Sequence, residues 1–147
     1  MCFLTFTACD ATDDAQAGLV GDWTFDEGVG DTAADASGHG NAAVIRHGGW
    51  GDGHHGHALR MPGGNDGIVT VPLSESLRST ADQITIMAWT YRTAQHNVAV
   101  VSHGYPALFF GFHGAKYKWQ FKRANGRIMA CYADPKYVAA EIGRAHV

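Results

Sequence analysis

Carboxylate and amide oxygens are concentrated in the glycine-rich stretch that runs from Trp23 to Asn41. Calcium prefers oxygen ligands, and Asp26, Asp35 and Asn41 could supply them together with free loop carbonyls. The spacing differs from that of an EF-hand, because no glutamate occupies the twelfth position of an aspartate-rich loop. A second interpretation needs no ion, since aspartate and serine side chains also hold loops by bonding to nearby amides. Both interpretations stay open, and a calcium ion here would be structural rather than catalytic.

Polar donors alternate with aromatic residues in the stretch KYKWQFKR. In an extended strand, Lys118, Gln120 and Lys122 lie in one row on one face of the sheet. Ammonium and amide groups suit the hydroxyls and carboxylates of an acidic glycan. Aromatic rings stack on sugars, and Tyr105 and Trp50 are the candidate platforms. The alternative is an ordinary solvent-facing side of an antiparallel sheet.

The sequence lacks the side-chain sets of common hydrolytic reactions. Glycoside hydrolysis needs two carboxylates flanking one bond, and the candidate strands ITIMAWTY, ALFFGFHG and KYKWQFKR carry no acid. A serine nucleophile elbow is also absent. Four histidines cluster in RHGGWGDGHHGHA, but no cysteine or carboxylate completes an obvious metal shell beside them. We therefore predict that this chain is not an enzyme, a prediction that does not extend to a longer parent protein.

The N-terminal sequence MCFLTFTACDATDD resembles the end of a bacterial lipoprotein signal. A short apolar run precedes Cys9, the residue that would be lipidated, and an acidic, polar stretch follows it. The match departs from the usual pattern at Phe6, where an aliphatic residue is commoner. No Lys or Arg precedes Cys9, although a signal needs a basic region. The expectation is a secreted or cell-surface protein, attached to a membrane only by a lipid anchor, with residues 1–17 as signal remnant and tether.

Most of the remaining chain has the pattern of short strands separated by glycine-rich turns. The expected strands lie in GLVGDWTF, NAAVIRH, GHALRMP, IVTV, ITIMAWTY, NVAVVSHG, ALFFGFHG, KYKWQFKR and RIMACYA. Asn125-Gly126 predicts a hairpin turn, and only Ser74–Thr80 indicates a helical turn. Trp23, Trp89 and Trp119 fall on apolar faces and are expected in the core. Many short strands at regular spacing predict a β-sandwich or jelly roll.

Three stretches resemble the concanavalin A-like, laminin-G-like domains of secreted bacterial proteins: LVGDWTFDEGVGDTAADASGHGNAAV, WGDGHHGHALRMPGGNDGIVTVP and ITIMAWTY. The resemblance extends from Leu19 to about Ala139. It departs at Met61-Pro62-Gly63, and the family's later Trp-x-His-Val-Ala-x-Thr-Tyr-Asp-Gly stretch and closing strands are absent. It implies an all-β fold, an antiparallel β-sandwich of the concanavalin A-like lectin/glucanase type over residues 18–140, incomplete at its C-terminal end. Many relatives carry a structural calcium ion.

Composition limits the classes of partner. The chain has 147 residues, of which 46% are hydrophobic and 17% charged, and its net charge is −3. This suits one globular domain and points to neither nucleic acid nor an anionic membrane. The tail EIGRAHV, residues 141–147, shows no strand pattern, and its reverse translation resembles a sequencing-library adapter, as in a metagenomic fragment. We expect a non-native tail and an incomplete, aggregation-prone sandwich.

These features predict a non-catalytic carbohydrate- or surface-binding module that forms part of a larger secreted or lipid-anchored protein. Its partner would be a polysaccharide or cell-surface glycan, held by weak contacts that repeat along the polymer. Two alternatives stay open. One is a fragment of a polysaccharide-degrading enzyme of the same fold, a glycoside hydrolase or a lyase. The other is a protein-binding adhesion module.

Overall fold

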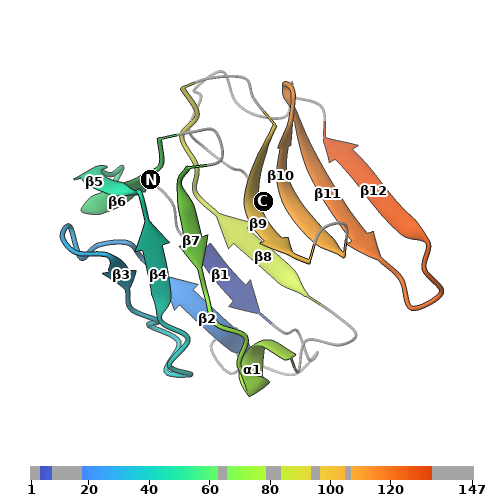
Figure 1. Ribbon diagram of the computed structural model, residues 1–147, viewed down its shortest axis with the longest axis horizontal. Helices are drawn as coiled ribbons and strands as arrows, with labels where there is room; N and C mark the ends of the chain where they lie inside the picture. The colour runs from blue at the N-terminus through green and yellow to red at the C-terminus, as the bar shows by residue number, and fades with distance from the viewer. Residues whose placement is uncertain are drawn as a thin grey trace. The chain divides into compact units, whose positions relative to one another are not determined.

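The structure used here is a computed structural model that describes residues 4–7, 18–62, 66–78, 84–93, 97–104 and 107–133 (Figure 1). These residues form antiparallel strands and one short helix, which confirms the predicted all-β class. The chain divides into two compact units, Met1–Thr90 and Tyr91–His146, which we call the N-terminal and C-terminal units. Cys9, Tyr105 and residues 141–147, for which the sequence makes specific predictions, lie outside the described residues.

The first sheet of the N-terminal unit has its earliest strand at its centre. The sheet has the order β2-β1-β8 and consists of β1 (Leu4–Thr7), β2 (Leu19–Trp23) and β8 (Thr85–Ala88). Both neighbours run antiparallel to β1, and Leu4 pairs with Trp23 on one side and with Ala88 on the other. The sequence predicts β2 and β8 but not β1, whose residues fall within the expected signal remnant and tether. Part of that segment therefore belongs to a sheet.

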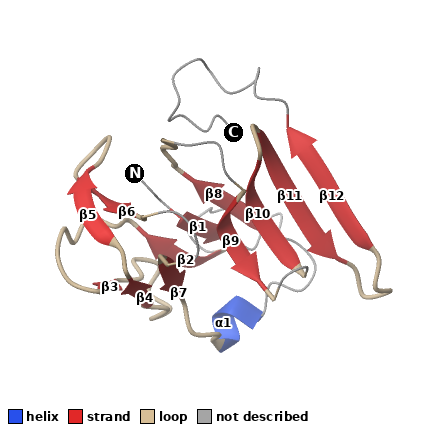
Figure 2. Ribbon diagram, turned by 45° about the horizontal axis from the view of Figure 1, so that its top comes forward, coloured by secondary structure: helices blue, strands red, loops and turns tan. Residues whose placement is uncertain are grey.

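Two further small sheets and the helix complete the N-terminal unit (Figure 2). The second sheet has the order β3-β4-β7 and consists of β3 (Thr32–Ala33), β4 (Ala43–Arg46) and β7 (Ile68–Thr70). A hairpin is formed by β5 (Gly49–Asp52) and β6 (His57–Arg60). The predicted helical turn is α1 (Glu75–Arg78). Ser74 caps it, because the Leu77 amide donates to the Ser74 hydroxyl at 3.3 Å.

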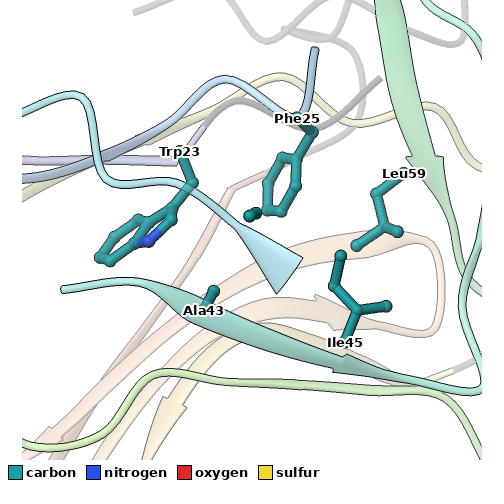
Figure 3. Packing of buried hydrophobic residues seen from close by; sticks show 6 residues of the cluster. Trp23, Phe25, Ala43, Ile45 and Leu59 are labelled. Atoms are coloured by element: carbon teal, nitrogen blue, oxygen red, sulfur yellow. The ribbon is translucent and has the colours of Figure 1, made fainter. Parts of the chain in front are cut away.

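The core of the N-terminal unit is built around Trp23, which is only 1% exposed. Figure 3 shows its indole beside Ala43, with Phe25, Ile45 and Leu59 gathered next to it. The indole Nε1–H donates to the Asn41 carbonyl at 2.7 Å, so the polar edge of the ring is also satisfied. Phe25 enters this core with φ 56°, a left-handed conformation that is unusual for a bulky side chain. Packing of its ring therefore offsets local backbone strain.

The C-terminal unit contains one four-stranded antiparallel sheet of order β12-β11-β10-β9. Its strands, consecutive in sequence and in space, are β9 (Val98–His103), β10 (Leu108–His113), β11 (Lys116–Lys122) and β12 (Ile128–Ala133). The pairing of β9 with β10 shifts register between Phe110 and Gly111. A Cβ at Gly111 would collide with the Val98 carbonyl oxygen of β9. Glycine is therefore required where the irregular strand approaches β10.

The turn predicted at Asn125-Gly126 is confirmed and joins β11 to β12. The Gly126 amide donates to the Arg123 carbonyl, and the Arg123 amide donates to the Arg127 carbonyl, both at 2.9 Å. Gly126 has φ 80°, as expected for the left-handed position that ends a three-residue hairpin loop. The Arg127 amide also donates to Asn125 Oδ1 at 3.1 Å, so the chain reversal depends on these hydrogen bonds and one glycine.

The core prediction for the tryptophans is correct for Trp23 and wrong for Trp89. Trp89 is 40% exposed, because β8 ends at Ala88 and the alternation that placed Trp89 on an apolar face stops there. Trp119 is half-buried in β11. The periodicity of a strand indicates which side chains share a face, but the strand's end decides how far that face extends.

Candidate functional site

The carboxylate of Asp35 holds the glycine-rich loop of the N-terminal unit together. Its Oδ1 accepts hydrogen bonds from the amides of Asp22 and Ser37, both at 2.9 Å. Its Oδ2 accepts one from the Asn41 amide at 2.8 Å. Burial raises the pKa of Asp35, but bonds from the Ser37 hydroxyl and these three amides outweigh it, and the net pKa is lowered. The ionised carboxylate is therefore part of the fold.

Asn41, the next predicted calcium ligand, is 3% exposed and is bonded on all sides. Its side-chain Nδ2 donates to the Val20 carbonyl at 2.8 Å and to the Ser76 hydroxyl at 3.0 Å. Its backbone carbonyl oxygen accepts from the Trp23 indole. Asn41 therefore links the loop to β2, to α1 and to the core, as a buried amide with its hydrogen bonds satisfied.

Two more acids of this loop also bind backbone amides. Asp26 Oδ1 accepts from the His57 amide at 3.0 Å, and Glu27 Oε1 accepts from the Ala34 amide at 2.7 Å. The structure thus brings Asp35 and Asn41 together directly and joins Asp26 to β6. Across residues 18–62 and the other described segments, no group of three or more His, Cys, Asp or Glu side chains is arranged to hold a metal ion. The observed bonds match the interpretation of a loop held by its own side chains, and calcium stays a prediction.

Trp50, one of the two predicted sugar platforms, takes part in the same loop. Its indole Nε1–H donates to the Gly30 carbonyl at 2.8 Å, and its ring packs against the core around Trp23. Both the polar edge and part of the ring are therefore used within the protein. The other predicted platform, Tyr105, lies outside the described residues.

The predicted donor row on β11 has burial opposite to the expectation. Lys118 is 9% exposed and Gln120 4% exposed, whereas Lys122 is exposed. The aromatic residues on the other face of the strand, such as Trp119, are only half-buried. Alternation correctly assigns these residues to two faces, but it does not reveal which face is covered. Within the row only Lys122 is freely exposed, and a glycan site along the row stays a prediction.

Lys118 nevertheless has a distinctive environment on this sheet. Its ammonium lies 5.3 Å from the centroid of the Phe109 ring and 6.0 Å from that of the Tyr132 ring. These distances suit attraction between a cation and two aromatic faces. Gly111 lies directly across the strand pair from Lys118. Tyr132 lies opposite Lys118 on β12 and is 52% exposed.

The charges of the chain are divided unequally between the two units. Between Tyr91 and Ala133 the sequence contains six cationic side chains and no Asp or Glu. The six are Arg92, Lys116, Lys118, Lys122, Arg123 and Arg127. Met1–Thr90 contains twelve acids and three arginines. The net charge of −3 conceals this division, so an analysis of charge by segment would have found the basic unit.

On the opposite face of the same sheet, Arg92 lies against aromatic rings. Its guanidinium carbon is 4.3 Å from the centroid of the Phe112 ring, and its Nη1 donates to the Gly114 carbonyl at 3.1 Å. Phe112 in turn contacts Tyr117, with ring centroids 4.7 Å apart. Burial raises the pKa of Tyr117, and the positive charge of Arg92 opposes that rise. These contacts give Arg92 a structural role within the unit.

No protein-family model, curated protein or solved structure matches this chain. The helix in the described part of the chain has four residues, and none there is long and apolar enough to cross a membrane. The features available for a functional inference are therefore the acid-bonded loop of the N-terminal unit and the basic sheet of the C-terminal unit. The acids Asp26, Glu27 and Asp35 of the loop already accept hydrogen bonds from backbone amides of the same unit. The stretch that forms the basic sheet contains cationic residues and no Asp or Glu.

Proposed function

We propose that this chain is a non-catalytic module that binds acidic polysaccharide through the sheet of its C-terminal unit. The observation that carries the proposal is the run of six cationic side chains without an acid between Tyr91 and Ala133. Like charges close together repel each other, and a polyanion relieves that repulsion while its own counterions are released. Lys116 and Lys122 are exposed on β11, where they are accessible to such a polymer.

The proposal includes the fold and setting that the sequence resemblance implies. We propose a laminin-G-like jelly-roll sandwich, secreted or held at the cell surface, in which calcium could occupy the loop that contains Asp26 and Asp35. Antiparallel sheets throughout the described residues support the sandwich only at the level of class. Weak sites repeated over several copies of the protein would give useful avidity on a polymer.

A binding assay with matched polymers tests the function. Purified protein should bind polygalacturonate or chondroitin sulfate and should bind neutral laminarin far more weakly under the same conditions. Binding should weaken as the salt concentration rises from about 0.05 M to about 0.5 M, because exposed charges are screened beyond about 8 Å at physiological ionic strength. Equal binding to neutral and acidic polymers, or absence of binding to every acidic polymer, would contradict the proposal.

A further inference from the structure

We propose that Lys118, Phe109 and Tyr132 form the seat for one uronate residue of the polymer, with the carboxylate on Lys118 and the sugar ring on Tyr132. This inference rests on the proposed function and specifies its ligand. The bound unit is a six-membered sugar ring that carries its carboxylate directly on the ring.

The first step concerns the ammonium of Lys118. The residue is nine-tenths buried, and among the described residues no hydrogen bond or ion pair to its ammonium is present besides the two ring contacts. No side-chain nitrogen or oxygen in that part of the chain is both fully buried and without a hydrogen-bond partner. The lysine stem is therefore covered while its charged end reaches the surface between the rings. Such a cation is oriented in advance and can accept an anion at little cost in side-chain entropy.

The second step concerns the charge around the seat. Lys116 and Lys122 lie on the same face of β11, two positions to either side of the pair Lys118 and Gln120, and both are exposed. With no acid between Tyr91 and Ala133, no carboxylate in this stretch of sequence can neutralise them. The local field therefore favours an anionic ligand, and the Lys118 ammonium, held between the two rings, gives that ligand a defined position.

The third step concerns the aromatic ring. Tyr132 is 52% exposed, and its centroid is 6.0 Å from the Lys118 ammonium. A ligand that stacks on this ring must therefore carry its negative charge close to the stacked surface. A uronate meets this condition because its carboxylate is attached to the ring itself. In a nucleotide the ribose separates the stacked base from the phosphate, so the spacing favours the sugar acid.

The experiment is an NMR titration of the whole chain with trigalacturonate and with neutral galactotriose. Lys118→Met keeps the stem length but removes the charge, and it should weaken trigalacturonate binding about tenfold, the loss expected for one charged contact. It should leave galactotriose binding unchanged. Tyr132→Ala should weaken both ligands, whereas Tyr132→Phe should behave as wild type because the ring face is retained.

Wild-type spectra give a measurement that does not depend on the folding of a variant. Trigalacturonate should shift the Lys118 side-chain ε-methylene and Tyr132 ring signals first. Unchanged signals at both residues under saturation would overturn the seat, as would wild-type affinity in Lys118→Met. Competition by a single-stranded oligonucleotide at lower concentration would assign the seat to nucleic acid instead. Salt-sensitive polygalacturonate binding that keeps its wild-type affinity in Lys118→Met would reject the seat and retain the proposed function. Absence of binding to every acidic polymer in the wild-type protein would reject both.

Discussion

The two units of this chain use charge in different ways. In the N-terminal unit, Asp26, Glu27 and Asp35 accept hydrogen bonds from backbone amides, so negative charge stabilises the loop that follows β2. In the C-terminal unit, the stretch from Tyr91 to Ala133 contains six cationic residues and no acid, and the ammonium of Lys118 contacts aromatic rings rather than a carboxylate. A charge that has internal partners supports the fold, whereas a charge without them is available to a ligand. Five experiments test whether this distinction holds.

The largest effect is expected from removing the aromatic core of the N-terminal unit. Trp23→Ala should lower the free energy of unfolding by about 4 kcal/mol, because it leaves a large cavity and an unpaired Asn41 carbonyl. Trp119→Ala is the matched change on the half-buried face of β11 and should cost roughly half as much, since less surface returns to water. Urea unfolding followed by amide hydrogen exchange measures both. Equal losses for the two variants would show that the units are packed alike.

The next effect concerns the internal partners of Asp35. Asp35→Ala removes the acceptor of three amide bonds and should lower the free energy of unfolding by about 2–3 kcal/mol. Asp31→Ala is the control, because Asp31 is an exposed acid of the same loop, and it should change stability by less than about 0.5 kcal/mol. Similar losses in the two variants would contradict the role given to Asp35.

The ionisation of Asp35 adds a pH dependence. Its folded pKa is lowered, so its contribution is fully present above the unfolded pKa of about 4 and is lost as pH falls through the lower folded value. Thermal unfolding between about pH 6 and pH 2.5 should therefore show that the melting temperature of the wild type falls more steeply with decreasing pH than that of Asp35→Asn. Parallel curves would show that the amides bond equally well to a neutral acceptor.

A smaller effect is expected from reversing one exposed charge in the basic unit. Lys122→Glu should weaken polygalacturonate binding about three- to tenfold and reduce its dependence on salt, because one contact to a carboxylate of the polymer becomes repulsive. Arg46→Glu makes the same charge change at an exposed position of β4 in the N-terminal unit. It should leave binding nearly unchanged. Equal losses would mean that net charge alone, and not its location, controls binding.

Calcium should produce the smallest change. The oxygens of Asp35 already accept three amides and Asp26 bonds to the His57 amide, so an ion would share ligands with existing hydrogen bonds. At millimolar calcium we expect a stabilisation of no more than about 1 kcal/mol, the value for an ion present at a few times its dissociation constant. Differential scanning fluorimetry of demetallated protein, with Asp35→Asn as control, measures it. A larger shift that disappears in Asp35→Asn would show that the loop serves an ion as well as the fold.

Local patterns in the sequence predicted most strands, and the long-range arrangement was less accessible. Strands β9 to β12 and the turn at Asn125-Gly126 were predictable because period-two alternation and turn residues act over a few positions. Strand β1 was missed because its apolar residues fit a signal remnant equally well. The short strand β3 has two residues, too few to show any period.

The candidate site was predicted in composition but not in detail. Lys118 was singled out from its place in the row, yet the rings that its ammonium contacts, Phe109 and Tyr132, belong to neighbouring strands. Asp35 and Asn41 were named as ligands for an ion, and their actual partners include amides that are near in sequence and groups as distant as Ser76. The residue type at one position tells which hydrogen bonds or charges its side chain can offer. Which group it contacts is determined only by the fold.

Strand β1 has a consequence for how the chain acquires its structure during synthesis. In the first sheet Leu4 of β1 pairs with Ala88 of β8. The central strand β1 therefore gains its second neighbour only after the chain as far as Ala88 has left the ribosome. The sheet of the C-terminal unit joins only successive strands, so each hairpin can close as soon as it is made. Short-range pairing closes faster than long-range pairing. The C-terminal unit therefore has the topology to fold quickly once it is made, while the N-terminal unit, although translated before it, remains exposed to chaperones for longer.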